Sequence, residues 1–288
     1  LRKYVESLKS NPWYNEKDKI AEPLFQKYHN SRFLSRVIIV MIFLILYNAY
    51  YRIALNYPEL DELVLIFTLI CTFVLGSLSI RYQRRMYESI VDLLIKQCDP
   101  YSHILASSKF IYRERGTLYA KYYNYRMNIA IAMSWAGDAK EALAYGELIW
   151  NESKISKKIP LSILQYHHLR LSCFSQLGFL EELEKEEHII GEFIKKHQRF
   201  KRKKATEDIL VMYNIKKSMN DESYEEAKAL ILDRLSKKTY KYLKVYYSYI
   251  LWTIYEKLNL PEEGAPYKAY ALKHGNELFF MKNLKEEP

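Results

Sequence analysis

Glycine and proline are scarce in this chain, with eight of each among 288 residues. Both residues interrupt helices, so their scarcity, together with abundant Leu, Lys, Glu and Tyr, is typical of helices joined by short turns. Three cysteines show no paired spacing, which argues against a disulfide framework and against a zinc site. Cysteines of this kind are typical of a reducing compartment. We therefore predict an all-α protein.

Motifs of known catalytic and nucleotide-binding sites are also missing. The sequence has no GxxxxGK[ST], GxGxxG, HExxH or GxSxG segment. His167 and His168 are adjacent, so on a helix their side chains point about 100° apart and cannot easily share a metal ion. Glu184 and His188, four residues apart, fit an ion pair on a charged helix better than a metal site. We predict no enzyme activity, no cofactor and no metal.

Two long uncharged runs lie near the N-terminus. The first has fifteen residues between Arg36 and Arg52, and the second has eighteen residues, from Leu63 to Ile80. At 1.5 Å per residue the second makes a helix of about 27 Å, close to the hydrocarbon thickness of a bilayer, about 30 Å. The first is shorter, but the arginines at its ends can reach toward the lipid headgroups. The runs predict a transmembrane helical hairpin over residues 34–81.

A signal peptide or a buried core helix could also produce the first run. The run begins only after 36 mostly polar residues and has no small-residue cleavage site, which argues against a signal peptide. The slightly negative mean hydropathy of the whole chain fits a soluble protein with a buried helix. Two such runs separated by a short acidic loop favour the membrane hairpin.

Charge predicts the orientation of this hairpin. Residues 1–36 carry eight Lys or Arg, whereas the loop between the runs is mainly acidic. By the positive-inside rule, both termini face the cytoplasm of a cell-membrane protein with two spans. The prediction divides the chain into a cytoplasmic segment over 1–33, amphipathic or an ordinary surface helix, the hairpin over 34–81, connecting helices over 82–117, and a helix-pair array over 118–288.

A turn followed by a helix recurs within the last of these segments. GDAKEAL, LGFLEELEKEEHII, DESYEEAKALIL and LPEEGAPYKAYAL each open a helix that carries a small or apolar anchor residue. The anchors are Ala142, Leu183, Ala227, and Gly264 or Ala265, with spacings of 41, 44 and about 38 residues. A lone helix pair cannot bury its apolar face, so such pairs stack on one another.

This series resembles the tetratricopeptide (TPR) repeat, in which helix A, a turn and helix B recur. GDAKEAL and SYEEAKAL match the turn and the opening of helix B in that family. Leu183 departs from the small residue of the family, and the spacing exceeds its usual length of about 34 residues. The resemblance implies a divergent TPR-like α-solenoid of about four helix pairs. An irregular helical bundle is the alternative.

The resemblance also implies a binding groove. In TPR-like proteins the second, fifth, sixth and ninth positions of helix A face a peptide. Amide side chains suit a peptide backbone there, and Lys216 could meet a carboxylate. Exposed polar residues without a function would look the same. Counted from the anchors, the groove residues are Asn124, Asn128, Gln165, His168, Ser172, Tyr213, Lys216, Tyr246 and Tyr249.

A basic tract, KKHQRFKRKK, interrupts the array, in a chain whose net charge is +10. An anionic membrane surface attracts such residues by about 1 kcal/mol each. A solvated loop without a function is the alternative, and nucleic acid is disfavoured because no recognised binding module accompanies the tract. Its basic residues are Lys195, Lys196, Arg199, Lys201, Arg202, Lys203 and Lys204.

These features together predict a membrane-anchored protein–protein interaction adaptor. It would bind a peptide segment or a partner helix through a cytoplasmic TPR-like groove, and the anchor would raise the effective concentration of membrane-bound partners. A peptide-responsive sensor or regulator, or an accessory subunit of a membrane transport or secretion complex, is the alternative.

Overall fold

The computed structural model describes residues 1–56, 61–113, 119–154, 156–197, 204–237, 239–281 and 284. Most of these residues are helical, and no strand occurs among them. The prediction of an all-α protein is therefore confirmed. The chain divides into two compact units: a two-helix unit, Lys19–Val91, and a main unit formed by Leu1–Asp18 and Asp92–Pro288.

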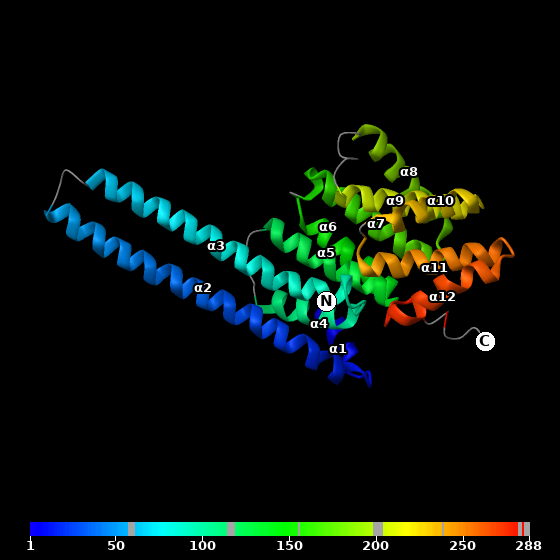
Figure 1. Ribbon diagram of the computed structural model, residues 1–288, viewed down its shortest axis with the longest axis horizontal. Helices are drawn as coiled ribbons and strands as arrows, with labels where there is room; N and C mark the ends of the chain where they lie inside the picture. Colours follow the sequence, from blue (N-terminus) through cyan, green and yellow to red (C-terminus); the bar gives the residue numbers. More distant parts are fainter. Residues whose placement is uncertain are drawn as a thin grey trace. The chain divides into compact units, whose positions relative to one another are not determined.

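The two-helix unit is built from most of α2 (Tyr14–Asn56) and most of α3 (Asp61–Ile95), which lie side by side (Figure 1). The ring of Tyr28 packs edge-on against that of Tyr87, with 6.5 Å between their centroids. The two predicted N-terminal helices are thus present as neighbours.

Apolar side chains cover the outside of the two-helix unit. Phe33 on α2 is 65% exposed and Phe73 on α3 is 76% exposed. In the described part of the chain one helix, spanning Tyr14–Ile53, is long and apolar enough to cross a membrane. The apolar part of α3 found among described residues, Leu65–Ser79, is shorter. Length and composition therefore support one membrane-spanning helix.

The main unit contains the remaining helices. In chain order they are α1 (Arg2–Leu8), α4 (Pro100–Arg113), α5 (Tyr119–Ala136), α6 (Ala139–Glu152), the short 3-10 helix η2 (Ser156–Lys158), α7 (Pro160–Leu177), α8 (Leu180–Lys196), α9 (Lys204–Asn220), α10 (Tyr224–Ser236), α11 (Lys241–Lys257) and α12 (Pro261–His274).

Helices α5 to α12 pack as four successive pairs (Figure 1). Each odd-numbered helix packs against the next, and α7 also contacts α5 and α9. The predicted anchors lie on the second helix of each pair. Ala142 and Ala227 are fully buried, Leu183 is 8% exposed, and in the last pair Gly264 is buried whereas Ala265 is exposed. Helix pairs therefore occur where the repeated segments predicted them.

One type of turn joins the two helices of every pair. Gly137, Gly178, Glu222 and Asn259 have φ angles of 93°, 71°, 55° and 57°, in the left-handed region. In each turn the next residue donates its backbone N–H to the carbonyl five residues earlier, over 2.8 to 3.1 Å. This is the Schellman motif, which satisfies the last carbonyls of a helix. The four turns between paired helices thus share one backbone conformation.

Both ends of the chain contribute to the main unit. Lys17 is buried and bridges Asp99 at 3.0 Å and Glu277 at 2.9 Å. The ring of Trp13 packs on that of Tyr101, with 4.2 Å between centroids. The segment predicted over residues 1–33 is consequently split, because its first 18 residues belong to the main unit.

Candidate ligand-binding site

The first helices of the four pairs surround a cavity of about 210 Å³. Four of the nine predicted groove residues line it: Ser172, Lys216, Tyr246 and Tyr249. The other lining residues are Ser134, Trp135, Ser175, Gln176, Met212, Ile250 and Phe279. We refer to this space as the central cavity.

Four further predicted residues do not line the central cavity. Asn124 is exposed, while Asn128, Gln165 and His168 are half-buried. Asn128 precedes the lining residue Trp135 by seven positions, so the two share one face of α5. Gln165 has the same relation to Ser172 on α7. These residues extend the faces that form the cavity toward the N-terminal ends of the helices.

The predicted position of Tyr213 in the groove is wrong. Tyr213 is buried in a core cluster with Leu171 and Ile190, and its hydroxyl donates to the carbonyl of Glu187 over 3.2 Å. Met212, one residue earlier, lines the central cavity instead. Successive helical residues point about 100° apart, so an error of one position exchanges the cavity for the core.

Lys216 provides the positive charge of the central cavity. Its ammonium donates to the Ser172 hydroxyl over 3.3 Å. Within the described part of the chain, it forms no salt bridge with a carboxylate. Burial penalises the charged form and lowers the pKa of Lys216 to about 8. Lys216 is half-buried, and a half-buried cation without a salt bridge among the described residues is uncommon in a folded protein.

His168 lies one helical turn before Ser172. Its Nε2 is buried and has no hydrogen-bond partner among the described residues. Burial, and secondarily the charge of Lys216, lower the pKa of His168 to about 3, so the imidazole is neutral at physiological pH. The nearby Cys173 thiol is buried too, and burial raises its pKa to about 12. Neither side chain is in a state suited to proton transfer or nucleophilic attack near pH 7.

Aromatic rings close the central cavity on one side. Trp135 packs edge-on against Tyr246, with 5.4 Å between centroids, which brings α5 into direct contact with α11. The segment after α12 lies against the same rings: Phe279 donates its backbone N–H to the carbonyl of Trp135 over 2.9 Å, and Phe280 stacks on Tyr249 at 4.7 Å. Sequence reasoning missed this segment. Two adjacent phenylalanines beyond the last predicted helix were the available signal.

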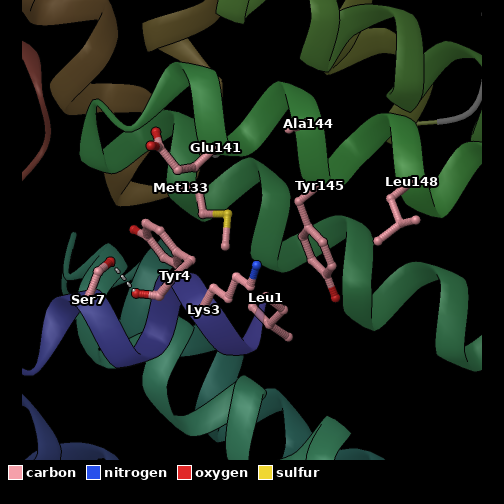
Figure 2. A pocket seen from close by; sticks show the side chains of 9 residues that line it. All are labelled: Leu1, Lys3, Tyr4, Ser7, Met133, Glu141, Ala144, Tyr145 and Leu148. Carbon is pink, nitrogen blue, oxygen red and sulfur yellow. Dashed lines mark hydrogen bonds between the residues drawn. The ribbon is translucent and has the colours of Figure 1, made fainter.

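A second cavity, of about 460 Å³, lies between α1 and the first helix pair. Figure 2 shows Lys3 and Tyr4 extending from α1 toward Met133 and Tyr145. Tyr4 donates its hydroxyl hydrogen to a carboxylate oxygen of Asp138. None of the predicted groove residues lines this cavity.

The basic tract is described only at its ends. Lys195 and Lys196 are exposed in the last turn of α8, and Lys195 pairs with Glu192 at 2.8 Å. Binding of this tract to an anionic surface stays a prediction. The remaining residues lie outside the described residues, for Lys204 the side chain only: Arg199, Lys201, Arg202, Lys203 and Lys204.

The central cavity is suited to binding. It combines one cation, several neutral hydrogen-bonding groups and aromatic walls.

Among the described residues no group of three or more His, Cys, Asp or Glu side chains could hold a metal ion. No protein-family model, curated protein or solved structure matches this chain.

Proposed function

We propose that this chain is a membrane-anchored adaptor that binds a peptide segment or a partner helix through the first helices of its pairs. The observation that carries the proposal is the convergence of α5, α7, α9 and α11 on the central cavity. A surface built from several helices can contact an extended ligand along its length. Binding by several helices in this way requires no chemical reaction at the site.

The arrangement of the array supports a TPR-like α-solenoid. Four pairs follow one another with the same left-handed turn between their helices. Stacked pairs bury a continuous core, and their regular offset produces a concave surface on one side. In this proposal the central cavity lies on that concave surface.

The membrane part of the proposal is a two-span anchor with both termini in the cytoplasm. Exposed apolar side chains on α2 and α3 support it, since water would not stabilise such a surface. The eight basic residues within 1–36 support the cytoplasmic orientation of the N-terminus.

Thiol labelling of intact cells tests the topology. Cysteines are introduced singly at Asn56 and Ser236, which are both exposed, into a chain carrying Cys71→Ser. The native Cys98 and Cys173 are buried and protected. An impermeant maleimide is expected to label position 56 in intact cells and position 236 only after permeabilisation. Labelling of position 236 in intact cells would contradict the orientation.

Co-purification from native membranes in a mild detergent tests the adaptor function. We expect the double substitution Asn128→Ala with Gln165→Ala to reduce recovery of a bound partner at least tenfold. Both side chains are half-buried polar groups on the faces that form the cavity, so their loss removes hydrogen bonds to a ligand while leaving the core intact.

The matched control changes Lys140 and Glu184 to alanine. Both are exposed and lie on α6 and α8, the second helices of their pairs. Recovery of the partner should equal that of the wild type. Equal recovery of the partner by the Asn128→Ala, Gln165→Ala variant and by the control variant would contradict the proposed binding surface.

A further inference from the structure

The segment after α12 lies against the first helices of the first and the last pair. This C-terminal segment, residues 275–281, contains two turns, in which the backbone N–H groups of Leu278 and Met281 donate to carbonyls three residues earlier over 3.1 and 2.9 Å. The side chain of Phe279 lines the central cavity, and that of Phe280 has no exposed surface. The segment therefore forms part of the wall of the cavity.

Two contacts of this segment are of the kind that a bound peptide makes. Phe279 donates its backbone N–H to the carbonyl of Trp135 over 2.9 Å, in the last turn of α5, where carbonyls lack a partner within the helix. The ring of Phe280 lies in an aromatic pocket, with centroid distances of 6.3 Å to Trp135, 5.9 Å to Tyr246 and 4.7 Å to Tyr249. The backbone bond is open to any residue type, whereas the pocket selects a side chain.

Release of the segment would leave no buried charge unpaired. Glu277 pairs with Lys17 at 2.9 Å, and its side chain is 31% exposed. Lys17 is buried and also pairs with Asp99 at 3.0 Å, so it keeps a counter-ion when Glu277 leaves. Asn276, whose amide donates to the carbonyl of Gln97 over 3.3 Å, is exposed. Water can therefore replace the partners of both polar side chains.

The segment fills its site incompletely. A space of about 210 Å³ remains beside Phe279. A tyrosine or tryptophan in its place would occupy more of that space, and its O–H or N–H could donate to oxygens of Ser175 or Gln176, which line the same cavity. A peptide with a better-matched aromatic pair would consequently bind more tightly than the chain's own segment.

We propose that residues 275–281 are an internal ligand, and that a partner binds by displacing them with two adjacent aromatic residues of its own. The inference rests on the proposed function, because it names the partner chemistry and the regulation of the same site. A tethered segment has an effective concentration of about millimolar, so it competes strongly with a separate peptide. The apparent affinity for a partner is reduced by the small fraction of chains in which the segment is released.

Binding of a labelled peptide to the full chain in neutral detergent micelles tests the inference. The probe is fluorescein-labelled GNELFFM, the sequence of residues 275–281, measured by fluorescence polarisation against empty micelles. The double substitution Glu277→Gln with Phe279→Ala weakens the internal segment. We expect it to increase the affinity for the probe at least tenfold over the wild type, because the released fraction rises. A second peptide, with alanine in place of both phenylalanines, should bind neither chain.

Hydrogen exchange measures the release itself. In the same double variant, amides of residues 276–281 should exchange at least tenfold faster than in the wild type, because the segment opens more often. The matched control is Glu262→Gln with Phe179→Ala. Both of these residues are exposed and lie outside the segment, so the control should match the wild type in exchange and in probe binding. A thermal melt establishes that each variant is folded.

Three outcomes overturn the inference: equal binding of GNELFFM to the wild type and the folded double variant, equal binding of the alanine peptide and GNELFFM, or unchanged exchange of residues 276–281. These outcomes leave the adaptor function standing if recovery of a partner still depends on Asn128 and Gln165. Conversely, probe binding that increases with release supports the internal ligand even where no partner co-purifies. The two proposals therefore fail separately.

Discussion

Replacing Phe280 with alanine is expected to lower the free energy of unfolding by about 3–5 kcal/mol. Phe280 has no exposed surface. Its ring packs against Tyr249 at 4.7 Å, Tyr246 at 5.9 Å and Trp135 at 6.3 Å between centroids. The substitution removes buried apolar surface and leaves a cavity between α5 and α11. These are the first helices of the first and the last pair.

Phe179→Ala is the matched control for this change. Phe179 follows the turn after α7 and is 45% exposed, so we expect its loss to cost less than about 1 kcal/mol. Urea unfolding in detergent, followed by far-UV circular dichroism, measures both. Should Phe280→Ala cost no more than Phe179→Ala, the C-terminal segment would not stabilise the contact between the first and the last pair.

Replacing Lys216 with methionine is expected to change the free energy of unfolding in the opposite direction. We expect the free energy of unfolding at pH 7 to rise by about 1–3 kcal/mol, because a half-buried cation without a salt bridge among the described residues is replaced by an apolar side chain of similar length. The pKa of Lys216 falls from 10.5 to about 8 on folding. That difference corresponds to an upper value of about 3 kcal/mol.

The sign of the pH dependence follows from proton binding. Between about pH 8 and 10.5 the unfolded chain holds the proton on Lys216 and the folded chain does not, so the wild type gains stability from this group as pH rises. The penalty is complete below pH 8 and disappears above 10.5. The advantage of Lys216→Met should therefore be constant from pH 6 to 7.5 and decrease by pH 10.

Urea unfolding at pH 7 and at pH 10 measures this difference. Lys217→Met is the control, since Lys217 is exposed and its replacement should change stability by less than about 0.5 kcal/mol at either pH. A Lys216→Met variant that is less stable than the wild type at pH 7 would contradict the isolation of this charge. A gain in stability would mark Lys216 as a residue that the fold does not require.

Local features of the sequence were sufficient for most of the fold. Each helix pair is marked by a turn and by a small or apolar anchor, and two of these anchors, Ala142 and Ala227, are fully buried. Gly137 and Gly178 mark two of the left-handed turns by residue type, because glycine adopts positive φ at little cost. The other two turns use Glu222 and Asn259, which identify them less clearly.

Residues far apart in the chain decided the candidate site. Ser172, Lys216, Tyr246 and Tyr249, which were found by counting back from their anchors, reached the central cavity. Tyr213 did not, since a register counted from a divergent anchor can differ by one residue, which turns a side chain by about 100°.

The sequence by itself determined the helices, their order in pairs and the two apolar N-terminal runs, because these depend on periodicity, turn residues and hydrophobicity within short windows. Tertiary structure alone decided that Trp135 meets Tyr246 and Phe280, and that Lys216 has no anionic partner among the described residues. Both facts depend on contacts between helices that are far apart in the chain, and short-range patterns do not encode such contacts.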